Sequence, residues 1–158
     1  MNPIVRNVLA VLAGFIVGSA VNMTLVVVGS MVVPDPEGVD MKKINDIKDF
    51  DEKMVALKYA MQKFTPAHFL FPFLAHALGT LVGAFLAAKL AASHGAKLAL
   101  GIGGFFMIGG ITMVVMVGGP IWFIAADLIV AYIPMGLLGA VLAGATSPSQ
   151  SSPDPEPA

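Results

Sequence analysis

The hydrophobic positions of this chain collect in four long runs that polar segments separate. A membrane-spanning helix needs about 20 consecutive, mostly apolar residues, and each of the four runs is long enough. They cover residues 4–33, 66–92, 97–117 and 120–145. The sequence therefore predicts an all-α protein, a bundle of four transmembrane helices in a single membrane domain of residues 1–146.

The segment between the first two runs has a different pattern. After the turn-forming sequence PDPEGVD, apolar residues recur every three or four positions from residue 41 to residue 64, a spacing that places them on one face of a helix. We expect an amphipathic helix over residues 41–64, with Asp40 as its N-cap, lying on the membrane or over the end of the bundle. A solvated arm that only links two spans is the alternative.

Prolines predict where the second span begins, where two spans bend and where the chain is disordered. Thr65 followed by Pro66 is a hydroxyl cap with a proline at the first helical position, where the missing N–H costs nothing, so the second span should begin there. Pro72 and Pro134 lack the N–H that would bond the carbonyl four residues earlier, which predicts kinks in the second and fourth spans. Residues 147–158 contain four prolines and four serines, which predicts a disordered tail.

Composition and charge agree with a membrane protein and narrow its partners. Hydrophobic residues make up 57% of the 158 residues and charged residues only 12%, against about 25% charged in soluble domains. A net charge of −1 provides no basic surface for nucleic acid, so the lipid bilayer is an expected partner and nucleic acid is not. The chain has no cysteine, which leaves histidine, acidic and methionine side chains for any chemistry.

We expect an integral, multi-pass protein of a bacterial inner membrane with both termini in the cytoplasm. Arg6, Lys89 and Lys97 flank the spans on the side of the termini, as positive charges do on cytoplasmic faces. A bare count of lysines favours the opposite orientation, because six lie in the first loop. Seven acidic residues accompany them there, and the loop is expected to fold.

Small residues recur every four positions in the first two spans, and such strips let membrane helices approach closely. We expect them to pack the helices of one chain together or to form a homo-oligomer. The third span contains five glycines, so it should be tightly enclosed or locally flexible. The strips are Ala10, Gly14, Gly18 and Asn22 in the first span, and Ala75, Gly79, Gly83 and Ala87 in the second.

The few polar residues inside the spans fall at similar depths. With a rise of about 1.5 Å per residue, Asn22, His76, Thr112 and Asp127 all lie in the half of the membrane nearer the first loop, and His68 lies further out on that side. A charge near the bilayer centre costs at least about 2.5–3.5 kcal/mol, so such groups usually face the bundle interior and pair. We expect Asp127 to pair with His76, with Asn22 and Thr112 as hydrogen-bonding neighbours.

Two functions fit this polar layer. In the first, the protein is a small accessory or structural subunit of a larger membrane complex, and the layer only fixes helix packing. In the second, it is a proton- or ion-coupled carrier or channel; the pathway candidates are Asp127, His76, Asn22, Thr112 and His68. Binding of a ligand or metal at the layer is a third alternative.

The sequence carries no motif of a conventional enzyme, because G-x-S-x-G, H-E-x-x-H and the phosphate-binding P-loop are all missing. We therefore expect no enzymatic activity. We also expect no cofactor and no metal, since His68 and His76 are about 12 Å apart along a helix and cannot share one ion.

Overall fold

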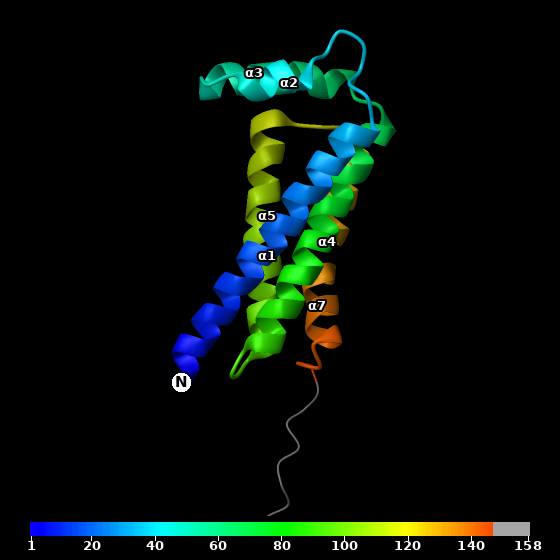
Figure 1. Ribbon diagram of the computed structural model, residues 1–158. Coiled ribbons are helices and arrows are strands. Elements are labelled where there is room, and N and C mark those ends of the chain that lie inside the picture. The colour runs from blue at the N-terminus through cyan, green and yellow to red at the C-terminus, as the bar shows by residue number, and fades with distance from the viewer. Residues whose placement is uncertain (147–158) are drawn as a thin grey trace, which may run out of the picture.

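The structure is a computed structural model that describes residues 1–146, and the tail predicted at 147–158 lies outside the described residues. Every regular element of the described part is an α-helix (Figure 1), so the all-α prediction is confirmed. In chain order the helices are α1 (Pro3–Val32), α2 (Met41–Asp46), α3 (Phe50–Lys63), α4 (Pro66–Leu90), α5 (Gly95–Val117), α6 (Ile121–Val130) and α7 (Ile133–Leu142).

Within residues 1–146, four parts are long and apolar enough to cross a membrane: α1, α4, α5 and the stretch Ile121–Leu142 that contains α6 and α7. The four predicted spans are therefore confirmed as helical elements, with ends within a few residues of those expected. The fourth span is not one helix, because α6 and α7 are separate helices in a single span.

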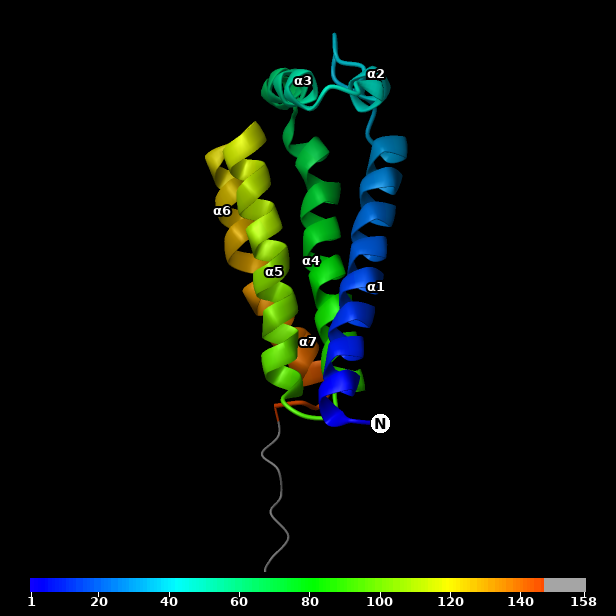
Figure 2. The ribbon, with the colours of Figure 1, turned by 90° about the vertical axis from the view of Figure 1, so that its left-hand side faces the viewer.

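Helix α4 lies at the centre of the bundle. It packs against α1, α5 and α7, and Figure 2 shows it between α1 and α5. Most of its buried residues are alanine or glycine, whose small side chains let neighbouring helices approach closely. Helix α4 begins at Pro66 with Thr65 as its N-cap residue, as predicted.

The small-residue strips of α1 and α4 face each other in an antiparallel register. A Cβ atom added to Gly18 would lie 2.7 Å from the carbonyl oxygen of Gly79, and one added to Gly79 would lie 2.8 Å from the carbonyl oxygen of Gly18. Gly14 and Gly83 oppose each other in the same way. The strips therefore join two helices of one chain, and neither backbone leaves room for a side chain at these positions.

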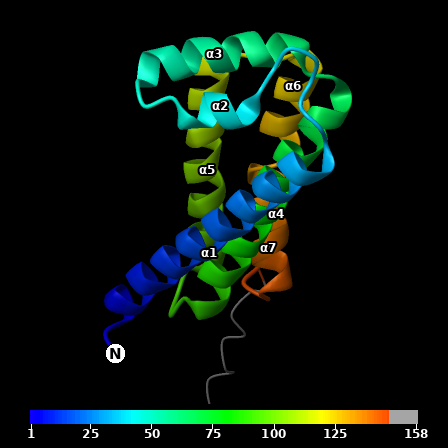
Figure 3. The ribbon, with the colours of Figure 1, turned by 45° about the horizontal axis from the view of Figure 1, so that its top comes forward.

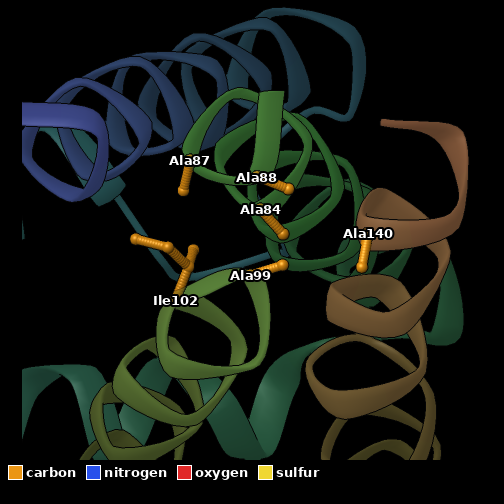
Figure 4. Close-up of a cluster of buried hydrophobic side chains, with 6 residues drawn as sticks. All are labelled: Ala84, Ala87, Ala88, Ala99, Ile102 and Ala140. Atoms are coloured by element: carbon orange, nitrogen blue, oxygen red, sulfur yellow. The ribbon is translucent and has the colours of Figure 1, made fainter. Parts of the chain in front are cut away.

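A second small-residue contact joins α4, α5 and α7 near the termini. Figure 4 shows this cluster, in which five of the six buried side chains are alanines. Gly139 of α7 lies so close to α4 that an added Cβ would be 2.8 Å from the backbone nitrogen of Phe85. The cluster consists of Ala84, Ala87, Ala88, Ala99, Ile102 and Ala140.

Polar side chains at the start of α1 close the end of α4. Nε of Arg6 donates a hydrogen bond to the carbonyl oxygen of Leu90 at 2.8 Å, a carbonyl at the end of α4. The side-chain oxygen of Asn7 accepts from the backbone N–H of Ala92 at 2.8 Å and of Ser93 at 3.3 Å. The Arg6 bond satisfies a carbonyl that the end of a helix leaves unpaired, and the Asn7 bonds satisfy N–H groups of the loop after α4. Together they fix the register between α1 and α4.

The prediction of one helix over residues 41–64 is wrong, because two helices, α2 and α3, occupy that segment. Asp49 interrupts it: its side chain accepts a hydrogen bond from the N–H of Glu52 at 2.8 Å and so caps α3. Asp40 caps α2 as predicted, and the backbone N–H of Lys43 lowers the pKa of its carboxyl group. Both helices lie across the loop-side end of the bundle (Figures 1 and 3).

The predicted kink at Pro134 takes the form of a break between α6 and α7. Ala131 and Tyr132 lie outside both helices, and Tyr132 adopts φ −114° and ψ −76°. Pro134 has no N–H to donate to the carbonyl of Val130, so the helix cannot continue in regular form. By contrast, α4 continues through Pro72 as one helix.

The α1–α4 contact yields a stability prediction. Replacing Gly18 with alanine places a Cβ against the Gly79 carbonyl and Phe106, so the variant should lose about 1–3 kcal/mol of unfolding free energy from overpacking. Gly104→Ala is the matched control, because a Cβ there meets no atom within 4 Å. Thermal unfolding in detergent measures both. Equal melting temperatures for the two variants would contradict the packing described.

Candidate functional site

Three side chains form a hydrogen-bonded triad inside the bundle. Nδ1 of His76 lies 2.8 Å from Oδ1 of Asp127, and the hydroxyl of Tyr132 donates to Oδ2 of Asp127 at 2.9 Å. The same hydroxyl oxygen lies 3.0 Å from Nδ1 of His76. Asp127 is 2% exposed and Tyr132 is 1% exposed, so the acid is enclosed and both of its oxygens are engaged.

The break between α6 and α7 brings Tyr132 to the acid. Tyr132 follows Asp127 by five residues, and in an unbroken helix the two side chains would point about 140° apart. The irregular backbone at Tyr132 removes this constraint, and the tyrosine turns back toward the carboxylate. The triad thus depends on the helix break that precedes Pro134.

Two glycines of α5 make room for Tyr132. A Cβ on Gly103 would lie 2.9 Å from the carbonyl oxygen of Tyr132, and a Cβ on Gly110 would overlap the tyrosine hydroxyl. Gly103 and Gly110 are seven residues apart, about two helical turns on one face. One glycine therefore admits the irregular backbone of Tyr132, and the other admits the end of its ring.

The hydrogen bonds determine where an added proton resides. If Asp127 is ionised and His76 is neutral, one proton on Nδ1 lies between the ring and Oδ1, and the triad carries one negative charge. Uptake of one proton gives either an imidazolium with a carboxylate or a neutral pair with the bridging proton on Oδ1. In both of these forms Nε2 of His76 carries a proton that it lacked before. Nε2 of His76 is therefore the atom at which a proton added to the triad would be bound.

His76 and Tyr132 both line a pocket, and His76 is the most exposed member of the triad. Its side chain is 27% exposed, against 4% for the side chain of Asp127. The pocket has a volume of about 300 Å³ and lies between α1, α4 and α5. Two of its lining residues, Met23 of α1 and Met113 of α5, are exposed. Its lining consists of Ser19, Asn22, Met23, His76, Thr80, Phe106, Gly109, Gly110, Met113 and Tyr132.

Two further residues predicted from the sequence, Asn22 and Thr112, differ in their position relative to the triad. The expected contact of His76 with Asp127 is present. Asn22 lines the same pocket as His76, but within residues 1–146 it makes no hydrogen bond to the pair, so that part of the prediction is wrong. Thr112 does not join them: its side chain is exposed, and its hydroxyl donates to the carbonyl of Ile108 in its own helix at 2.8 Å. The expectation that Thr112 neighbours the pair is wrong, because a helical threonine can satisfy its hydroxyl locally.

His68 lies apart from the triad and holds two segments together at the loop side. Its Nδ1 accepts from the backbone N–H of Thr65 at 3.1 Å, so Nε2 carries the ring proton and donates to the carbonyl oxygen of Pro34 at 3.0 Å. The ring also stacks on Phe64. These bonds tie the start of α4 to the chain just after α1.

Sequence reasoning missed Tyr132 and Thr80. The available signal for Tyr132 was its place two residues before Pro134, where a break can change the face that a side chain occupies. Thr80 follows His76 by four residues in α4, which places both side chains on one face of the helix. No group of three or more histidine and acidic side chains within residues 1–146 is arranged to hold a metal ion.

Comparison with protein-family models, with curated proteins and with solved structures gives no match to this chain. The geometry of the triad and its pocket is therefore the basis for a function.

Removing the hydroxyl of Tyr132 should lower the free energy of unfolding. Tyr132→Phe keeps the ring but leaves Oδ2 of Asp127 without its donor, so the variant should lose roughly 1–3 kcal/mol of unfolding free energy. Tyr59→Phe is the control, because Tyr59 is exposed on α3. Unfolding in detergent compares the two, and a Tyr132→Phe protein as stable as the control would show that the hydroxyl bond is unimportant.

Proposed function

We propose that this protein is a proton-coupled carrier or channel of four membrane spans, in which His76 and Asp127 bind and release the proton. One observation carries the proposal: the buried acid is bonded to a histidine that itself lines a pocket between α1, α4 and α5. A proton can thus reach the pair without the carboxylate being exposed. An acid placed only for packing would not need such access.

The surroundings of the pair favour the exchange of a single proton. His76 and Tyr132 are the only titratable side chains that line the pocket within residues 1–146. The neighbouring helix α1 contributes Ser19 and Asn22, and α5 contributes apolar residues and glycines. A net charge is costly within a membrane. The added proton cancels the negative charge of the triad, so the protonated triad needs no further ion.

The position of the protein in the membrane is part of the proposal. The four spans cross the bilayer of a bacterial inner membrane with both termini in the cytoplasm. Helices α2 and α3, which cross the end of the bundle (Figure 1), lie at the opposite membrane surface. The pocket and the triad then lie in the half of the membrane nearer that surface, and the protein acts alone, as a homo-oligomer or in a larger complex.

A structural subunit is the second candidate, and one observation favours it. The triad joins α4 to the break between α6 and α7, so it also fixes the irregular part of the fourth span. In this function the protein stabilises a larger membrane complex and moves no proton.

Asp127→Asn tests the two functions against each other. Without the carboxylate, a protonated His76 is an uncompensated charge in the membrane, which costs about 2.5–3.5 kcal/mol. Proton flux should therefore fall roughly 100-fold. Purified protein in liposomes with a pH gradient and an internal pH-sensitive dye measures this flux. Thr112→Val is the control, because Thr112 is exposed and bonded within α5, and its flux should match that of the unaltered protein.

Together with copurification from native membranes, the same variant also tests the subunit function. If the unaltered protein conducts no protons and Asp127→Asn disrupts copurification with a larger complex from native membranes, the carrier proposal is wrong. Retained folding with lost flux supports it.

A further inference from the structure

Thr80 is a buried polar residue whose hydroxyl has no hydrogen-bond partner within residues 1–146. The residue is 0% exposed, and it lines the same pocket as His76. A buried hydroxyl without a partner loses the hydrogen bonds it made to water in the unfolded chain, so native proteins nearly always satisfy such groups. The hydroxyl of Thr80 therefore needs an explanation.

Two other threonines in the membrane spans show that Thr80 is exceptional. Thr24 donates to the carbonyl of Ala20, and Thr112 donates to the carbonyl of Ile108, each at 2.8 Å and each four residues back in its own helix. The hydroxyl of Thr80 makes no bond to the carbonyl four residues back in α4, and the residue lines the pocket.

The position of Thr80 relative to His76 suits a bridging molecule. Residues four apart on a helix are neighbours, with Cβ atoms about 5–6 Å apart, yet no hydrogen bond joins the Thr80 hydroxyl to His76. One small molecule between the two side chains could bond to both. An internal water needs two to four polar partners. Thr80, Nε2 of His76 and the amide of Asn22, which lies across the pocket on α1 and packs on Gly79, can supply them.

We propose that Thr80 and His76 hold a water molecule between them, and that this water delivers the proton to the triad. The step starts with a hydronium ion that enters the pocket from the membrane surface nearer α2 and α3. One O–H bond of the hydronium breaks, the lone pair of Nε2 on neutral His76 forms the new N–H bond, and a neutral water remains bound to the Thr80 hydroxyl. Release is the reverse step. This inference rests on the proposed proton function and adds the route to it.

Thr80→Val and Thr80→Ser form a matched pair of variants. Valine keeps the shape of threonine and removes the hydroxyl, whereas serine keeps the hydroxyl and removes a methyl group. After a rapid pH drop, proton uptake by the purified protein in nanodiscs should be at least about tenfold slower in Thr80→Val than in the unaltered protein, because a positioned proton-transfer group is lost. Thr80→Ser should retain the fast uptake.

The number of protons bound at equilibrium should be the same in all three proteins, because the triad itself is intact. A purely structural role for Thr80 would change both the rate and the equilibrium, or neither. Equal uptake rates for Thr80→Val and the unaltered protein would overturn the proposed water. If the unaltered protein takes up no proton at all, the proposed function fails first, so the two failures are distinguishable.

Thermal stability gives an independent test. If the hydroxyl of Thr80 truly had no partner, Thr80→Val would remove an unsatisfied polar group and raise the melting temperature. With a bound water, the substitution also removes one of the partners of that water, and the melting temperature should stay the same or fall. A clear rise in Thr80→Val, with no rise in Thr112→Val, would contradict the proposal.

Discussion

The constraint on which this structure depends is the need to satisfy a carboxylic acid inside a membrane span. Lipid offers no hydrogen-bond donor, so both oxygens of Asp127 must find partners within the protein. His76 supplies one partner from α4, and Tyr132 supplies the other from the same span as the acid. The second bond requires a broken helix, and the broken helix requires Gly103 on α5 to let its backbone approach.

The same bundle is tightly packed at one end and open at the other. Glycine and alanine contacts hold α1 and α7 against α4, and Arg6 fixes the start of α1 to the end of α4. In Figure 2, α1 and α5 lie close together near the N-terminus and separate toward α2 and α3. The pocket beside His76 lies between these separating helices, so rigid packing at one end is combined with access to the triad nearer the other.

Much of this arrangement could be predicted from the sequence, because its causes are local or periodic. Apolar runs gave the four spans, four-residue spacing gave the facing strips around Gly18 and Gly79, and depth along the spans paired His76 with Asp127. The rest depends on three-dimensional detail. Tyr132 joins the acid only because the helix is broken, Thr112 satisfies its hydroxyl within α5, and Asp49 divides the loop helix by capping α3. A regular spacing of residues does not predict such helix breaks, caps and local hydrogen bonds.

The central claim is that the buried triad exchanges one proton, at Nε2 of His76. Nitrogen-15 NMR of histidine-labelled protein in nanodiscs tests it directly, with the other two histidines of the chain, His68 and His94, replaced by glutamine so that His76 is the one labelled ring. We predict that Nε2 changes from unprotonated to protonated as the pH falls, while Nδ1 keeps the signature of a strong hydrogen bond throughout. A ring whose Nε2 does not titrate, or whose Nδ1 loses its hydrogen bond instead, would contradict the account.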